Sequence, residues 1–355
     1  MKDKQKSKIK TLIISLSVFC VLYIIYAVRP LGTELHLSPE WTEDISRVKE
    51  TDPDDILIPY RLGYNIGYFT PDGKIASNRK FNFQASIDKD FWAIYQNNNT
   101  SCDIYDKSDN LLFTLKESGF PFFEEDRIFL FFPGGTSFAR YDMQGNKLWQ
   151  YEGYSPITAF ASSKALTVAG LADGTIVSIN NDGIIEQQFS PGGSETEIIM
   201  GIAVSADGQL IAAVTGQNHQ RVIVAQKNGE HSKIIFHEYL DADFKEQVAV
   251  SFNKKCDTVY FNYKGGLGII DLVKLKSSHI PIEGIISQIE ESDNPNLVFV
   301  LSHDGNNYQI TAIEPFDNNA GSFNFEAENS FIQIYKDALF IGRNNKISRI
   351  SISRR

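Results

Sequence analysis

The sequence predicts an all-β domain built from a repeated four-stranded unit. Aromatic residues make up 12% of the 355 residues, including 25 Phe and 15 Tyr, and such side chains suit the pleated, half-buried surface of strands. A pair of apolar strands joined by a polar Asp/Asn/Gly turn recurs along the chain, and Asn-Gly or Asp-Gly supplies the positive φ of tight hairpins. These hairpins lie at residues 68–77, 104–115, 140–151, 178–189 and 224–236.

The spacing of the hairpins gives the size of the repeated unit. Their turn centres are 36, 36, 38 and 46 residues apart, at Gly73, Asp109, Gly145, Gly183 and Gly229. A second strand pair recurs between the hairpins, at residues 157–179 and 198–214. A period of this length with four strands per unit is typical of a β-propeller.

Two of the repeats resemble known propeller families. VSADGQLIAAV (204–214) resembles the second strand pair of a tryptophan-aspartate (WD) repeat blade, and RYDMQGNKLWQY (140–151) is similar to quinoprotein-type propeller repeats. The likeness covers nearly all of residues 60–355. No copy carries the Gly-His opening or Trp-Asp ending of WD repeats, and only Trp149 stands at the quinoprotein tryptophan position. The resemblance therefore implies the fold of these families without their catalytic motifs.

The number of blades follows from the turns. Five clear turns and two degenerate ones, near Lys274 and Phe316, predict seven four-stranded blades, with eight as the alternative. The C-terminal strands at 331–353 lack a following outer strand, and the first hairpin at 66–80 lacks inner strands. We therefore expect the two ends to complete one blade together, which removes an exposed sheet edge. The propeller is assigned to residues 58–355.

The N-terminus predicts a membrane anchor. Thr11–Val28 contains no charge over 18 residues, a helical length of about 27 Å, close to the thickness of a bilayer core. Five lysines precede it, so residues 1–10 are predicted to be a cytoplasmic basic tail. The propeller then lies on the extracytoplasmic, periplasmic side of a bacterial cytoplasmic membrane. A cleaved signal peptide is the rival interpretation, but Arg29 and Pro30 replace the small residues of a cleavage site.

Residues 29–57 are predicted to be an acidic juxtamembrane linker containing a short amphipathic helix. Ser38 is a candidate N-cap with Pro39 at the first helical position, and Trp41, Ile45 and Val48 follow at helical spacing. We expect this helix to pack on the propeller as a spacer, with docking to a partner as the alternative.

Charge and cysteine content exclude several classes of function. The net charge is -10, and after the first 30 residues 28 basic side chains face 43 acidic ones, which disfavours nucleic-acid binding. The three cysteines have no metal-binding spacing, so neither a zinc site nor a disulfide framework is expected. A Cys102–Cys256 pair stays open as an alternative.

We predict no catalytic, cofactor-binding or metal-binding residue. The six histidines show no spacing that would place two ligands on one metal. SHDG (302–305) places Ser, His and Asp side by side, but neighbours on a strand point in different directions and cannot form a triad. GGLG (265–268) is interpreted as a strand-joining turn because no helix follows it.

FPFFEEDRIFLFF (120–132) is the densest apolar stretch of the predicted propeller. We interpret FPFF and IFLFF as two inner strands buried between adjacent blades, where polar alternation disappears. The alternative is an exposed Phe cluster that binds another protein.

These observations predict a non-catalytic scaffold, anchored in the membrane, that binds other membrane or periplasmic proteins and no nucleic acid. A sensor for a small ligand or glycan in the central channel is one alternative. A quinoprotein-like oxidoreductase is the other, and its pyrroloquinoline quinone would need clustered ligands and a catalytic Asp that the sequence does not supply. No cofactor is predicted.

Overall fold

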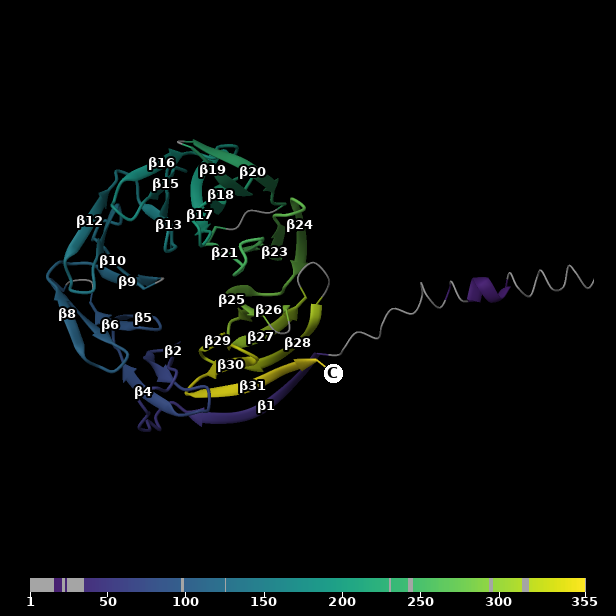
Figure 1. The fold of residues 1–355 in the computed structure, drawn as a ribbon, viewed down its shortest axis with the longest axis horizontal. Coiled ribbons are helices and arrows are strands. Elements are labelled where there is room, and N and C mark those ends of the chain that lie inside the picture. The colour runs from purple at the N-terminus through teal and green to yellow at the C-terminus, as the bar shows by residue number, and fades with distance from the viewer. Residues whose placement is uncertain are drawn as a thin grey trace, which may run out of the picture.

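The computed structural model contains eight β-sheets that are arranged in a ring around a central axis (Figure 1). It describes residues 16–20, 23, 35–96, 99–124, 126–229, 231–241, 245–293, 296–314 and 319–354. The predicted all-β propeller is confirmed, and the predicted number of seven blades is wrong because there are eight.

Seven of the blades contain four strands and blade 1 contains three. Blade 1 consists of β2 (Ile58–Leu62), β3 (Asn65–Phe69) and β4 (Ile75–Lys80). Blade 2 consists of β5 (Gln84–Ile87), β6 (Phe91–Tyr95), β7 (Cys102–Asp106) and β8 (Leu111–Leu115). Blade 3 consists of β9 (Phe120–Glu124), β10 (Arg127–Phe131), β11 (Ser137–Tyr141) and β12 (Lys147–Glu152). Blade 4 consists of β13 (Ile157–Ser162), β14 (Thr167–Leu171), β15 (Ile176–Ile179) and β16 (Ile185–Phe189). Blade 5 consists of β17 (Thr196–Val204), β18 (Leu210–Gln217), β19 (Arg221–Asn228) and β20 (His231–Tyr239).

The remaining blades follow the same order from the channel outward. Blade 6 consists of β21 (Val250–Phe252), β22 (Thr258–Tyr263), β23 (Gly266–Asp271) and β24 (Lys276–Pro281). Blade 7 consists of β25 (Ile285–Asp293), β26 (Asn296–Asp304), β27 (Asn307–Ile313) and β28 (Asn319–Glu326). Blade 8 consists of β29 (Ser330–Tyr335), β30 (Ala338–Arg343), β31 (Lys346–Arg354) and β1 (Leu35–Asp44).

The composition of blade 8 explains why a count of hairpin turns predicts seven blades. Its outer strand β1 comes from the N-terminal end of the propeller, and its other three strands come from the C-terminal end (Figure 1). The two outer strands of this blade therefore have no connecting turn, and a count of turns misses it. The prediction that the two ends complete one blade is confirmed, but the strand involved is β1 and not the hairpin at 66–80.

The prediction of a short helix in the linker is wrong, because β1 lies in its place. Residues 35–44 form a strand that pairs with β31 from Leu35–Arg354 to Asp44–Lys346. The apolar residues chosen for their helical spacing fit a strand because an edge of β31 is available for pairing. Pro39 lies on the outermost strand, at a register shift, where a missing N–H is tolerated. The propeller therefore begins at Leu35 and includes part of the predicted 29–57 linker.

The strand directions define two faces of the propeller. The start face is the side where inner strands begin, as at Gln84 and Phe120, and the end face is the side where they end, as at Ile87 and Glu124. β1 is antiparallel to β31 and begins beside Arg354, so the chain enters and leaves the propeller at the end face.

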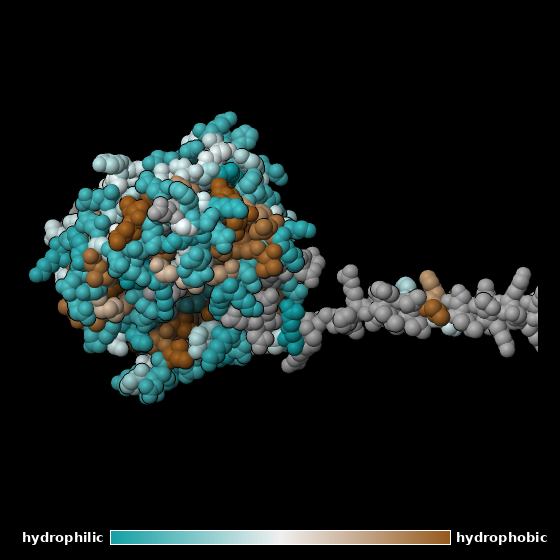
Figure 2. Space-filling view, turned by 45° about the horizontal axis from the view of Figure 1, so that its top comes forward, coloured by the Kyte–Doolittle hydropathy of each residue, from teal (hydrophilic) through white to brown (hydrophobic). Residues whose placement is uncertain are grey.

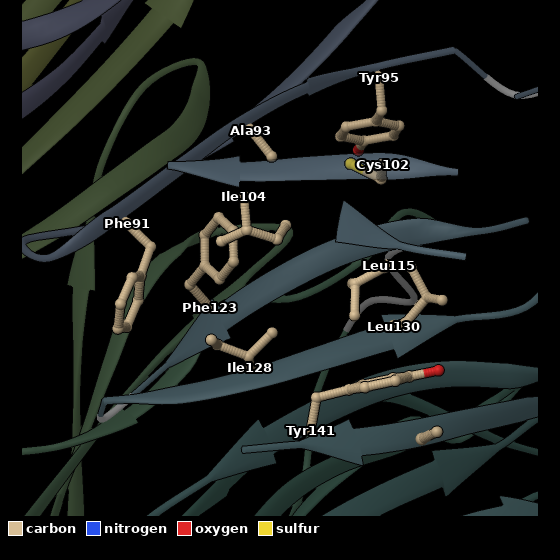
Figure 3. Close-up of a cluster of buried hydrophobic side chains, with 11 residues drawn as sticks. Phe91, Ala93, Tyr95, Cys102, Ile104, Leu115, Phe123, Ile128, Leu130 and Tyr141 are labelled. Atoms are coloured by element: carbon tan, nitrogen blue, oxygen red, sulfur yellow. The ribbon is translucent and has the colours of Figure 1, made fainter. Parts of the chain in front are cut away.

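The core lies between neighbouring blades. Figure 3 shows one such cluster, in which side chains of blade 2 such as Ile104 and Leu115 meet side chains of blade 3 such as Ile128 and Leu130. Strands near the middle of each blade are buried on both faces, and every residue of β10 and β14 is buried. Eight clusters of this kind form an almost continuous ring of apolar packing around the described part of the chain.

Most of the predicted anchor and the whole of the predicted tail, residues 1–10, lie outside the described residues. Residues 16–20 within the anchor segment are helical. Within the described ranges, no helix has the length and apolarity needed to cross a bilayer.

Candidate functional site

Exposed aromatic side chains gather on the start face and on the part of the channel wall nearest to it. Among the described residues of the propeller, the large aromatic side chains with the greatest exposure are Tyr64 (64%), Phe83 (57%), Phe120 (43%), Phe122 (36%), Tyr154 (106%) and Tyr239 (49%). Figure 2 shows hydrophobic patches separated by hydrophilic surface, one of them beside the central hollow.

Strand direction places each of these residues. Phe83 directly precedes the inner strand β5, Phe120 is the first residue of β9, and Tyr154 lies between β12 and the next inner strand β13. Tyr239 is the last residue of the outer strand β20. Tyr64 lies in the turn between β2 and β3. This turn is at the start face because β4 ends there, directly before β5, and β2, which like β4 is antiparallel to β3, runs in the same direction as β4. The Tyr64 carbonyl accepts a hydrogen bond from the N–H of Phe81, between β4 and β5, at 3.0 Å.

The end face carries a different kind of exposed side chain. Its outer turns expose aliphatic residues, including Met143 (49%), Ile184 (62%) and Val273 (81%). Isolated aliphatic side chains of this kind are ordinary on protein surfaces. Aromatic side chains are instead the residues enriched at protein interfaces and among binding hot spots. The start face is therefore the better candidate for an interface.

Phe120 and Phe122 correct part of the interpretation of residues 120–132. IFLFF falls mostly on β10, which is buried as predicted but is the second strand of the blade. FPFF falls on the inner strand β9, where exposed and buried residues alternate, so it is not buried on both faces. The alternative reading of exposed phenylalanines therefore holds for Phe120 and Phe122.

Neighbouring rings pack against these two exposed phenylalanines. Phe120 stacks on Phe131 with a centroid distance of 4.9 Å, and Phe122 packs edge-on against Phe160 at 5.5 Å. Near blade 1, Tyr64 packs edge-on against the buried Phe81 at 5.9 Å. Rings that are already ordered lose less conformational freedom when a partner binds. The start face thus offers pre-organised aromatic contacts.

The channel contains a cavity of about 570 Å³ near the end face. The last residues of β9, β13, β17 and β21 line it, together with the turns that follow them. Phe160, Ile202 and Phe252 form apolar walls, and Lys164 and Lys254 bring positive charge to the lining. Glu124 also lines the cavity and accepts a hydrogen bond from the Ser162 N–H at 2.8 Å. This volume lies within the usual range of small-molecule sites, roughly 300–1,000 Å³.

Glu290 on the inner strand β25 has a perturbed acidity. Burial raises the pKa of this carboxyl to about 7, and the Ile334 N–H and the charge of Lys254 oppose that rise. The folded protein therefore binds a proton at Glu290 over a pH range in which the unfolded chain has released it.

Replacing Glu290 should change how stability depends on pH. The raised pKa means that the wild-type protein loses stability as pH rises from the unfolded value of about 4.3 to about 7. We expect Glu290→Gln to remove this slope, so that the variant gains about 2 kcal/mol relative to wild type between pH 5 and pH 8. Urea unfolding at both pH values measures the difference. A constant offset between the two proteins at both pH values would contradict this account.

The sequence motifs judged non-functional have structural roles. Asp207 accepts hydrogen bonds from the Ser205 hydroxyl (2.6 Å) and the Gln209 N–H (3.0 Å), as expected of a turn residue. In GGLG, Gly265 completes a turn and β23 starts at Gly266, so the stretch is mostly strand. All three cysteines are free thiols, which removes the alternative of a Cys102–Cys256 pair.

The histidines are dispersed over the propeller. His279 lies 3.1 Å from a Glu238 carboxylate oxygen, and His303 packs on the Tyr308 ring with a centroid distance of 5.2 Å. Over the described ranges, no group of three or more His, Cys, Asp and Glu side chains is close enough to hold a metal ion.

Sequence reasoning missed most of the aromatic face. Tyr64 and Tyr154 stand in loops, in RLGYN and YEGYSP, and a bulky aromatic residue outside a strand pattern is a signal that could have identified them. Their presence on one face could not be read from the sequence, because it depends on which end of each blade a loop occupies.

Comparisons with known proteins agree with this architecture. A family model described as β-propeller protein matches residues 1–355. The chain belongs to this β-propeller family. A protein of Treponema pallidum (strain Nichols), named only "Uncharacterized protein", is 30% identical over 365 residues, which cover 99% of this chain and 96% of the relative.

Two solved structures share the fold. BamB from Moraxella catarrhalis has a TM-score of 0.63 at 12% identity and covers 89% of this chain and 100% of its own. Hsv2 from Kluyvelomyces marxianus has a TM-score of 0.54 at 11% identity and covers 77% of this chain and 95% of its own. Identities this low show the fold alone. The family model and these structures confirm the predicted resemblance to β-propeller proteins.

Proposed function

We propose that this protein is a non-catalytic scaffold, anchored in the bacterial cytoplasmic membrane, whose start face binds another protein on the extracytoplasmic side. The observation that carries the proposal is the concentration of exposed aromatic side chains on that face, while the large exposed apolar side chains of the end-face turns are aliphatic. Aromatic residues supply a large contact area at a low cost in side-chain entropy.

The position of Leu35 supports one orientation of the proposed scaffold at the membrane. The predicted anchor ends at residue 28, so six residues separate it from β1, which span at most about 20 Å when extended. Because β1 begins at the end face, this short connection holds the end face toward the bilayer and the start face away from it. The start face is then open to membrane-bound partners with domains that extend from the membrane surface.

Attachment to the membrane strengthens weak contacts. Two proteins held at the same membrane meet at a high effective concentration, so a modest interface suffices for a stable assembly. The aromatic residues of the start face are spread over blades 1, 2, 3 and 5 and the connection between blades 3 and 4, which favours a partner that covers several blades.

Site-specific photo-crosslinking in cells tests the proposal. A photoreactive residue is placed in the full-length protein at Phe83 on the start face or, as a matched control, at Ile184 on the end face. We expect one protein to recur in the Phe83 crosslinks and not in the Ile184 crosslinks. Adding Tyr154→Ala and Phe120→Ala should reduce that crosslink at least tenfold, because hot-spot residues contribute about 2 kcal/mol or more each.

Two control results decide between outcomes. Ile184→Ala together with Met143→Ala should leave the Phe83 crosslink unchanged, and replacing residues 11–28 by an unrelated membrane helix should preserve it. Equal capture from both faces, or a crosslink that survives the aromatic substitutions, would contradict the proposal. Accessibility of residue 2 from the cytoplasmic side and of residue 154 from the outside tests the orientation.

Ligand sensing in the channel is the second candidate function, and the 570 Å³ cavity favours it. The cavity combines apolar walls with charged residues at Lys164 and Lys254, the arrangement of many small-molecule sites. Phe252→Trp should fill part of the cavity without changing the start face. If this variant alters partner capture, the channel and the start face are coupled.

A further inference from the structure

A polar cavity of about 250 Å³ lies between blades 6 and 7 near the start face. Glu283 and Gly284, in the connection between the two blades, line it on one side. The start-face ends of β26, β27 and β28 line the rest. The side chains that argue for a site are Ser302, Gln309 and Asn324, with Asp304 and Asn307 at the hairpin end.

Strand register places the polar residues on one face of blade 7. Ser302 pairs with Gln309, and Gln309 pairs with Asn324, so the three side chains form a row across three strands. Further down β26, Val298 and Val300 have the same parity as Ser302 and pack into an apolar cluster with Ile269 of blade 6. The row therefore replaces apolar packing at the start-face end of the interface between the blades.

The side chains of the SHDG motif (302–305) do not all lie on the same face of blade 7. Ser302 and Asp304 lie on the face toward blade 6, whereas the intervening His303 packs on Tyr308. The motif is no triad, as the sequence indicates, but Ser302, His303 and Asp304 all contribute to the lining of the cavity.

Ser302 is the residue that points to a ligand. Its side chain is 1% exposed, and its Oγ has no hydrogen-bond partner within the described part of the chain. A buried hydroxyl without a partner is destabilising, and an apolar residue of similar size at this position would avoid that penalty. A molecule in the cavity that bonds to Ser302 Oγ removes the penalty.

The lining determines the chemistry of that molecule. Amide side chains both donate and accept hydrogen bonds, and the carboxylates of Glu283 and Asp304 accept them. The lining contains no Lys or Arg side chain, so it does not favour an anion. The volume corresponds to roughly eight water molecules, comparable with one sugar ring.

We infer that the cavity between blades 6 and 7 binds a neutral, hydroxyl-rich molecule the size of one sugar unit. This function is separate from the scaffold role, because the cavity lies beside blades 6 and 7 and the aromatic residues lie on other blades. A single sugar ring of about twelve heavy atoms should bind with a dissociation constant on the order of 1 mM.

Saturation-transfer NMR on the full-length protein, in a detergent without a sugar headgroup, tests the inference. The probes are glucose, galactose, mannose and N-acetylglucosamine. We expect at least one to bind to wild type, and Gln309→Leu with Asn324→Leu to weaken that binding at least tenfold. Ser302→Ala should weaken it about three- to tenfold. Gln226→Leu, on the exposed part of β19, is the matched control and should bind as wild type does.

Stability measurements separate loss of the site from loss of the fold. Without sugar, Ser302→Ala should unfold at the same temperature as wild type or higher, because it removes an unpaired hydroxyl. Sugar should raise the unfolding temperature of wild type but not of the double variant.

Three results would overturn the inference: no binding of any probe at 20 mM, undiminished binding by the double variant, or saturable binding of Ca²⁺ or tetramethylammonium in place of the sugars. The photo-crosslink at Phe83 should be unchanged in the double variant. Each proposal can therefore fail without the other.

Discussion

Deleting residues 1–44 should abolish the cooperative unfolding of the propeller, whereas deleting residues 1–34 should leave it intact. The longer deletion removes β1 and its nine paired positions on β31. It also removes Leu35 and Leu37 from the cluster between blades 7 and 8, and Trp41 from the cluster between blades 8 and 1. These three side chains are partly buried, and each contributes up to the roughly 1.5–3 kcal/mol of a fully buried side chain, in addition to the lost strand pairing.

The expected loss is comparable with the whole stability of a domain, which is about 5–15 kcal/mol. Trp41 has a further role because its Nε1–H donates to the Pro71 carbonyl of blade 1 at 3.3 Å and its ring packs on Phe340 at 5.9 Å. Without β1, the edge of β31 is open and invites pairing with other chains.

Urea titrations of both deletion variants, followed by circular dichroism and by tryptophan fluorescence, measure this effect. We expect the variant lacking residues 1–34 to give one sharp transition that coincides for both probes. The variant lacking residues 1–44 should give a broad transition at low urea or aggregate. Equal midpoints and slopes for the two variants would show that β1 is not needed for closure.

Phe138→Ala should destabilise the propeller by about 3–5 kcal/mol, the usual range for removing a fully buried aromatic side chain. Phe138 is completely buried and has ring contacts with Phe129, Phe131, Trp149, Tyr151 and Phe160. These rings come from both blade 3 and blade 4, so the cavity created by the substitution weakens the interface between the two blades.

Phe120→Ala is the matched control for Phe138→Ala. Both residues belong to blade 3 and both contact Phe131, but Phe120 is 43% exposed. We therefore expect this control to lose only about 1 kcal/mol, since much of its apolar surface already faces water. Chemical denaturation measures both variants. A loss at Phe138 no larger than the loss at Phe120 would show that the aromatic cluster does not support the fold.

The hairpin turns were predictable because their chemistry is local. Gly73, Gly145 and Gly183 all have positive φ, as the tight turns at the two Asp-Gly pairs and at Gln144-Gly145 require. The close packing around some of these glycines was not predictable. A Cβ on Gly183 would lie 2.5 Å from the Cβ of Trp149 in the neighbouring blade, and Trp149 Nε1 donates to the Asn181 carbonyl at 3.1 Å. Such contacts depend on how adjacent blades pack.

Residues 35–48 show why local patterns misled the prediction of a helix. A stretch with Ser38, Pro39 and Trp41 carries the signals of a helix start, yet its partner β31 lies more than 300 positions along the chain. Pairing with a distant strand outweighs a weak local preference. The same long-range pairing creates an eighth blade without a turn of its own.

The sequence by itself determined the all-β class, the repeated unit and its turns, because strand alternation and turn glycines are properties of neighbouring residues. Tertiary structure decided the closure by β1, the aromatic start face and the polar cavity beside Ser302. Those features arise when the ring closes, since closure brings distant strands together and assigns each loop to one of two opposite faces.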